Sequence, residues 1–285
     1  MISGTRYRLT AEINRQSDLA REIARAQMEI STQKRILNPS DDPIGAARVA
    51  EIDRTQANEE AWRRNVETAA ALASRADTTL ASVEAVMVRA KELMVAASSD
   101  TMSDQNRATI AAELAGIAED IATLIDTRDS RGALLFSPGD ALEIPVNAGL
   151  RVAPVASRAD IFEGIDTPGG PMDLVAIVAN AAAAVTEPDP GLREAAMRAS
   201  LEAVNAGTAH ITAERGEQGV RGARVDNIKE RLTESELQLN EVRTDIEGAD
   251  LVKVIASLEA KKLSLEAAQA VFARVNQNTL FDLLR

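Results

Sequence analysis

The sequence predicts a mainly α-helical protein: a long antiparallel helical coiled-coil rod formed by the N- and C-terminal segments, with a small β-containing central insertion. Near both ends of the chain, apolar residues recur with alternating three- and four-residue spacing over long stretches, a pattern typical of helix pairing. Aromatic residues make up only 2% of the 285 residues although 45% are hydrophobic. A core of Ala, Leu, Ile and Val suits thin helical assemblies better than a large globule.

The first helix is expected to run from near Thr5 to Leu37. It ends before a turn in which two prolines restrict the residues that precede them and the Ser and Asp side chains can cap a helix. The turn residues are Pro39, Ser40, Asp41, Asp42 and Pro43. The predicted subunit-packing residues of this helix, which follow a heptad pattern with spacings of four, seven or ten, are Leu9, Ile13, Ile23, Ile30 and Leu37.

A second helix is expected from about Ile44 to Ala97, and a third from Ser103 to about Asp126. The connection between them is short, which predicts antiparallel neighbours. The second helix contains an unbroken heptad stripe rich in alanine, which lets a partner helix approach closely. Its members are Val66, Ala69, Ala73, Ala76, Leu80, Val83, Met87, Ala90, Met94 and Ala97.

The pattern changes in the middle of the chain, where Gly and Pro residues interrupt several short apolar runs. These runs predict short strands at 133–136, 142–146 and 150–155, followed by a short helix from Asp173 to Val185. Prolines within two of the runs place them at sheet edges. This region is therefore predicted to be a small α/β insertion.

A long helix is expected to resume at Leu192, with a possible interruption at Gly216, Gly219 and Gly222 that favours close backbone packing. After Gly248 a terminal helix follows, capped by Asp250. Its predicted subunit-packing residues are Leu251, Leu258, Leu265, Phe272 and Val275, and nearer the end Leu280 and Phe281. The whole chain divides into an N-terminal axial helix and turn (1–43), two halves of a helical rod (44–130 and 191–247), the insertion (131–190) and a C-terminal axial helix (248–285).

Composition excludes several classes of function. The net charge of −12 argues against binding nucleic acid and against docking on an anionic membrane. The sequence shows no apolar run long enough to span a bilayer and no cleavable signal at its start. It has no cysteine, which excludes disulfides and thiolate metal sites.

No catalytic constellation is visible, and we expect no enzyme activity, no metal site and no cofactor. His210 is the single histidine, so a metal site with two histidines cannot be built within one chain, and the residue is expected at a surface or an interface. Asp41 and Asp42 could suggest a divalent-ion site. At a helix start, however, helix capping explains them better.

Several segments together resemble the flagellin superfamily. The run 32–43, which contains Pro-Ser-Asp-Asp-Pro, and the following Ile-Gly-Ala-Ala-Arg at 44–48 are similar to its N-terminal signature. The two prolines are similar to those of its hook–filament junction branch. The segments 129–136, 221–227 and 246–250, and the ending 279–284, are similar to the family's central entry, its long C-terminal helix and its terminal helix.

The resemblance implies a structural component of the bacterial flagellum, an adaptor that joins hook to filament by helical packing of its terminal segments. It implies a ring-like homo-oligomer that contacts an adjoining hook-associated protein and flagellin. It also implies export through the flagellar type III apparatus without a cleaved signal, assisted by an export chaperone. Two alternatives remain open: a filament subunit, and an intracellular coiled-coil scaffold.

Overall fold

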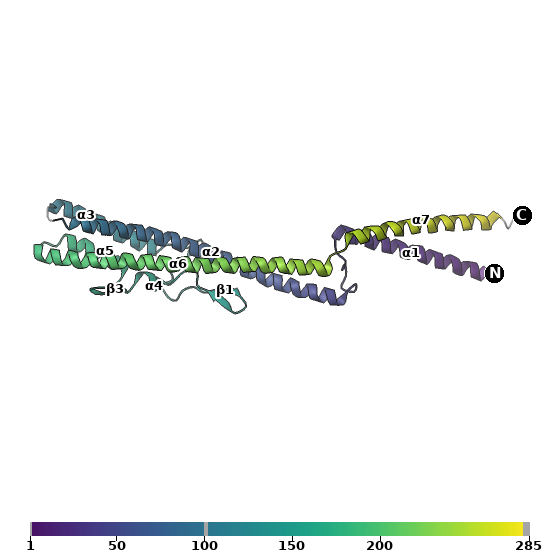
Figure 1. Cartoon of the computed structure of the whole chain (residues 1–285), viewed down its shortest axis with the longest axis horizontal. Helices are drawn as coiled ribbons and strands as arrows, with labels where there is room; N and C mark the ends of the chain where they lie inside the picture. The colour runs from purple at the N-terminus through teal and green to yellow at the C-terminus, as the bar shows by residue number, and fades with distance from the viewer. Residues whose placement is uncertain (1, 100–101, 282–285) are drawn as a thin grey trace. The chain divides into compact units, whose positions relative to one another are not determined.

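The computed structural model describes residues 2–99 and 102–281, with the side chains of 2–6, 8, 9 and 275–281 left aside. Figure 1 shows a predominantly helical chain with two small hairpins. The helices are α1 (Ile2–Thr32), α2 (Pro43–Ala97), α3 (Asp104–Ile125), α4 (Arg158–Phe162), α5 (Leu174–Val185), α6 (Pro190–Glu247) and α7 (Leu251–Phe281). The strands are β1 (Ile144–Asn147), β2 (Leu150–Val152), β3 (Ile165–Thr167) and β4 (Gly170–Met172). The mainly helical fold class with a small β-containing insertion is confirmed.

The chain divides into two compact units. The terminal unit comprises Met1–Ala57 and Ser235–Arg285, and the central unit comprises Asn58–Glu234. The helices α2 and α6 each contribute one part to each unit.

The core of the central unit lies where α2, α3, α5 and α6 pack together. All ten residues of the predicted α2 stripe are buried, from Val66 at 1% exposure to Ala97 at 2%. The alanines in this stripe allow neighbouring helices to approach α2 closely, and Gly207 on α6 has the same effect. A Cβ at Gly207 would lie 3.1 Å from the Met87 side chain and 3.2 Å from Leu174. The sequence pattern therefore identified the buried face of α2 correctly.

The insertion packs along the same helices. The antiparallel hairpin β1–β2 contributes Ile144, Val146 and Val152 to a second apolar cluster with residues of α2 and α6. Phe136 and Phe162 meet edge to face in the main core, with ring centroids 4.9 Å apart. A second hairpin, β3–β4, follows α4.

Three details of the expected element boundaries were wrong. The helix α1 ends at Thr32, because Gln33 takes a left-handed backbone conformation with φ of 57°. The helix α6 runs without interruption, and nothing lies within 4 Å of a Cβ built at Gly216, Gly219 or Gly222. Those glycines therefore serve no close packing within the chain. Residues 133–136 form an isolated bridge at Leu134 and no strand.

In the terminal unit, α1 and α7 lie side by side and run antiparallel, so that the start of α1 and the end of α7 lie at the same side of the pair (Figure 1). The beginning of α2 and the end of α6 belong to the same unit. Side-chain contacts join these two segments, including one from Gln56 to Asn240 at 2.8 Å and one from Arg243 to Asp53 at 3.1 Å.

Candidate functional site

The helix α7 shows the apolar stripe that the sequence predicts. Leu258 is buried, and Leu251, Leu265 and Phe272 are half-buried. Lys261 fills the remaining heptad position and pairs with Glu22 of α1 at 3.2 Å. This ion pair lies beside the α1–α7 seam, the contact between the inward faces of the two helices. Four predicted packing residues, Leu9, Val275, Leu280 and Phe281, have side chains outside the described part of the structure.

The seam face of α1 differs from the predicted one. Ile23 and Ile30 are half-buried and Ala26 is buried, whereas Ile13 is 51% exposed. The buried face is a heptad series that the apolar pattern alone missed, because two of its members are polar. Its members are Glu12, Gln16, Leu19, Ile23, Ala26 and Ile30.

Apolar side chains also point away from the seam. On α7, Val252, Leu263 and Val271 are 81%, 68% and 62% exposed. On α1, Met28 is 53% exposed, similar to Ile13. Several large apolar residues on the outward side of a helix pair are typical of a surface that packs against another protein. Ile13 thus remains a predicted subunit-packing residue, although it lies outside the seam.

The turn after α1 is organised by its two aspartates. Asp42 is the N-cap of α2 and accepts a hydrogen bond from the Gly45 amide at 2.9 Å. Asp41 accepts from the amides of Leu37 and Asn38 at 3.1 and 3.0 Å. Asp42 therefore has the capping role expected from the sequence. The capping role expected for Asp41 was wrong, because its carboxylate accepts hydrogen bonds from amides that precede it in the turn and that belong to no helix.

The two aspartates also pair with arginines. Arg25 contacts Asp41 at 3.1 Å, and Arg35 contacts Asp42 at 3.0 Å. The backbone hydrogen bond from Asn38, reinforced by that from Leu37 and by Arg25, holds the pKa of Asp41 below its ordinary value. The Gly45 amide and Arg35 do the same for the pKa of Asp42. Both carboxylates are therefore stabilised in their charged form.

Backbone bonds join this turn to the connection between α6 and α7. The amide of Arg35 donates to the Glu247 carbonyl at 2.6 Å, and the amide of Ala249 donates to the Gln33 carbonyl at 2.9 Å. The Arg35 guanidinium also donates to the Ile246 carbonyl at 2.9 Å. We call these two segments, residues 33–35 and 246–249, the clasp.

Glu247 adds charge to the clasp. Its carboxylate pairs with Lys34 at 2.9 Å and with Arg243 at 2.8 Å. Partial burial by itself would raise the pKa of Glu247, but the hydrogen bonds and charges of Lys34 and Arg243 outweigh burial and lower it. The carboxylate thus stays charged and holds both segments together.

Two backbone positions in the clasp restrict which residue can occupy them. Gln33 has a left-handed backbone conformation, which is unfavourable for any residue that carries a Cβ atom. A Cβ at Gly248 would lie 2.3 Å from the carbonyl oxygen of Thr244. Position 248 therefore requires glycine. From the sequence alone, Gly248 predicted only the end of a helix.

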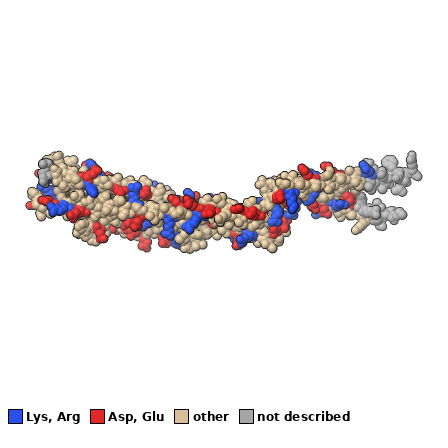
Figure 2. Space-filling model, in the orientation of Figure 1, with Lys and Arg blue, Asp and Glu red and all other residues tan. Residues whose placement is uncertain are grey.

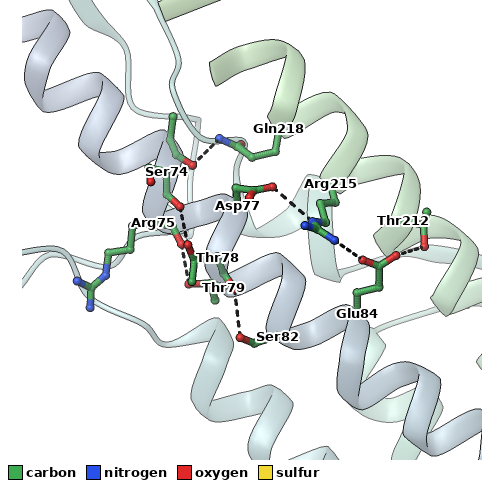
Figure 3. Close-up of polar contacts among 11 residues, drawn as sticks. Ser74, Arg75, Asp77, Thr78, Thr79, Ser82, Glu84, Thr212, Arg215 and Gln218 are labelled. Atoms are coloured by element: carbon green, nitrogen blue, oxygen red, sulfur yellow. Dashed lines mark hydrogen bonds and ion pairs between the residues drawn. The ribbon is translucent and has the colours of Figure 1, made fainter. Parts of the chain in front are cut away.

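In the central unit, polar contacts fix the register of α2 against α6 (Figure 3). Arg215 pairs with Glu84 at 2.8 Å and with Asp77 at 3.4 Å, and Thr212 donates to Glu84 at 2.8 Å. The hydrogen bonds from Arg215 and Thr212 lower the pKa of Glu84 in spite of partial desolvation. These contacts join α2 to α6 within the central unit.

Gln218 is almost fully buried in the same helix pair. Its amide donates to the carbonyl of Ala73 at 3.2 Å and to that of Pro154 at 2.8 Å. One side chain therefore ties α2, α6 and the segment after β2 together. The sequence analysis did not single out this residue, because a glutamine on a charged helix gives no signal of burial.

The remaining candidates show no catalytic geometry. The Nε2 atom of His210 lies 3.1 Å from the carbonyl oxygen of Ile161, and the ring is half-buried. Among the described residues, no group of three or more His, Cys, Asp or Glu could hold a metal ion. No described helix has a stretch long and apolar enough to cross a membrane. Acidic and basic side chains are interspersed over the visible face (Figure 2).

Comparison with known families settles the classification. The sequence model of the bacterial flagellin N-terminal helical region matches residues 8–139, and that of the C-terminal helical region matches residues 201–284. The chain belongs to the flagellin family. The two matched regions contain α1 from residue 8 onward, the whole of α7, the turn and the clasp.

The curated relatives include proteins named flagellar hook-associated protein 3 and proteins named flagellin. Flagellar hook-associated protein 3 of Escherichia coli is 23% identical over 287 residues, which cover 90% of each chain. The protein of the same name from Salmonella typhimurium is 32% identical over 109 residues, 38% of this chain and 34% of the relative. A flagellin of Listeria monocytogenes is 21% identical over 90% of this chain and 88% of the relative.

Solved structures confirm the fold. A putative flagellar hook-associated protein from Vibrio parahaemolyticus superposes with a TM-score of 0.65 at 20% identity, covering 73% of this chain and 100% of the other. A flagellar hook-associated protein-3 from Legionella pneumophila gives a TM-score of 0.64 at 12% identity, covering 70% of this chain and 98% of the other.

Proposed function

We propose that this chain is the adaptor that joins the flagellar hook to the filament. The observation that carries the proposal is the similarity to hook-associated protein 3 of Escherichia coli over 90% of both chains. The Pro-Ser-Asp-Asp-Pro turn supports it, because its two aspartates organise the connection between α1 and α2.

The terminal unit provides the physical means of assembly. The α1–α7 seam leaves exposed apolar residues on the outward side of both helices, such as Leu263 and Met28. In an oligomer these residues become buried against neighbouring subunits, and each fully buried large side chain contributes about 1.5–3 kcal/mol. Assembly then depends on the helix pair being formed, since the seam covers the inward residues of α1 and α7 and leaves the outward residues exposed.

The partners follow from the same proposal. The chain assembles with copies of itself and contacts a hook-associated protein on one side and flagellin on the other. It reaches this place through the flagellar export apparatus without a cleaved signal. An export chaperone that covers the apolar faces of α1 and α7 prevents association before export.

A filament subunit is the second candidate, because the Listeria monocytogenes flagellin matches over 90% of this chain. The two functions differ in self-assembly. A filament subunit adds to seeds and grows into long polymers, whereas a junction protein stops at a short, closed layer. Growth of long filaments from the purified chain would favour the second candidate.

Deletion of the gene tests the proposal in cells. The expected result is intact hooks without filaments, with flagellin released into the medium. Normal filaments on the deletion strain would contradict the junction role.

Complementation with matched variants then tests the seam. Leu265→Asp introduces a charge at a half-buried position of α7, whereas Gln269→Asp introduces the same charge one turn later at an exposed position. We expect Leu265→Asp to abolish filament assembly, since a buried unpaired charge is costly. Gln269→Asp should restore motility, and equal behaviour of the two variants would refute the assignment of the seam.

A further inference from the structure

A pocket of about 500 Å³ lies in the central unit and is lined by residues from the end of α2, the first turn of α3 and the first turns of α6. This volume falls within the range of small-molecule sites, about 300–1,000 Å³. Its lining combines apolar side chains with cations. The apolar members are Ala97, Met197 and Leu201, and the cationic members are Arg107, Arg193 and Arg198.

The three arginines differ in how far their charge is already neutralised. Arg198 pairs with Glu194, which also lines the pocket, at 2.9 Å. Arg193 donates to the neutral backbone carbonyl of Glu187 at 2.9 Å. Within the described ranges 2–99 and 102–281, neither Arg193 nor Arg107 makes an ion pair with a carboxylate. Two positive charges therefore remain uncompensated in one pocket.

Arg107 is only partly satisfied by the protein. Its Nε atom is shielded from solvent and, among the residues that the structure describes, has no hydrogen-bond acceptor. Because this atom is also closed off from the pocket, an anion there contacts the other N–H groups of the guanidinium, which carries five N–H donors in all.

The chemistry of the lining indicates what that acceptor is. A guanidinium presents a planar fork of N–H donors that matches the oxygen atoms of a carboxylate or a phosphate. The chain as a whole carries a net charge of −12, which repels free anions at long range. Local contacts inside the pocket are therefore needed to hold one.

We propose that this pocket is a binding site for a small oxyanion, with carboxylate or phosphate groups that contact Arg107 and Arg193. The apolar floor formed by Met197 and Leu201 accommodates a short carbon skeleton, which favours a carboxylate compound over inorganic phosphate. The site lies in the central unit, outside the terminal helices, and goes beyond the role in flagellar assembly.

Isothermal titration of the full-length protein with citrate, and separately with inorganic phosphate, tests the proposal at constant ionic strength set by sodium chloride. We expect saturable binding of one citrate per chain and weaker binding of phosphate. Arg107→Gln should weaken citrate binding about tenfold or more, because a hydrogen bond to a charged group contributes about 1.5–3 kcal/mol. Arg224→Gln, which removes an exposed arginine of α6 outside the pocket, is the matched control and should bind as the wild type does.

Circular dichroism melting of each variant shows whether that variant folds. If Arg107→Gln fails to fold, Arg193→Gln is used instead, and it should weaken citrate binding by the same factor. Absence of saturable binding to either anion would overturn the proposal, as would equal weakening in Arg107→Gln and Arg224→Gln. Binding of a glutamate-rich peptide, with no response to citrate or phosphate, would also overturn it and assign the pocket to an acidic protein partner.

Discussion

Replacing Gly248 by alanine is expected to open the clasp of the terminal unit. A Cβ at this position lies 2.3 Å from the Thr244 carbonyl oxygen, far inside the 3.4 Å at which ordinary contact begins. The backbone has to move, and the movement breaks the bonds of Arg35 to Glu247 and of Ala249 to Gln33. At about 1 kcal/mol for each hydrogen bond, the clasp loses about 2 kcal/mol.

Hydrogen exchange followed by mass spectrometry measures this loss locally, through the amides of residues 33–35 and 247–249. The matched control is Gly219→Ala in α6, where the added methyl group meets open space. Because alanine favours a helix interior over glycine by about 1 kcal/mol, this control should slow exchange around residue 219. Unchanged protection of the clasp in Gly248→Ala would refute the role assigned to this contact.

Three further predictions follow from the terminal unit. Gln33→Gly should stabilise the clasp by about 0.5–1 kcal/mol in urea unfolding, because glycine adopts a left-handed conformation without strain; a loss of stability would contradict this. Leu258→Ala should reduce hydrogen-exchange protection of α1 and α7 by about 2 kcal/mol. Leu263→Ala should leave that protection unchanged and yet reduce incorporation into flagella, so loss of protection in both variants would contradict the two-face description. Because Asp42 and Glu247 have lowered pKa values in the folded state, their contribution is complete above the ordinary carboxyl pKa of about 4 and is lost as pH falls below it. Thermal melting between pH 6 and pH 3 should therefore show a smaller acid-induced decrease in Glu247→Gln than in the wild type, and an equal decrease would contradict the assignment.

The sequence predicts the helical framework of the central unit well. The α2 stripe from Val66 to Ala97 repeats without a polar member, so the heptad frame has one solution and every predicted residue is buried. The hairpin β1–β2 could also be predicted from the sequence, because buried residues alternate with exposed residues along β1. The hairpin β3–β4 could not be predicted, because each of its strands is only three residues long and β4 contains Gly170 and Pro171.

The frame of α1 shows where periodicity becomes ambiguous. Ile13 and Ile23 fit one apolar series, but the observed seam includes Glu12 and Gln16 and leaves Ile13 exposed. A two-helix seam is narrow, and the aliphatic parts of long polar side chains can line its edges. The predicted and observed faces therefore agree at Ile23 and Ile30 and differ toward the start of α1, where the position of α7 decides which residues are covered.

The clasp could not be predicted from periodicity. Its contacts join Arg35 to Ile246, which are 211 positions apart, and they involve backbone atoms that carry no sequence signal. The aspartates of the turn gave a partial signal as capping residues. The orphan donor of Arg107 and the buried amide of Gln218 likewise depend on neighbours that come together only in the fold.

Gold labelling of intact flagella tests the central proposal most directly. An epitope tag inserted at the exposed turn Pro168–Gly169, between β3 and β4, leaves the seam and the clasp untouched. A single cluster of label where the hook meets the filament is the predicted result. Label along the whole filament would contradict the junction role and identify the chain as a filament subunit.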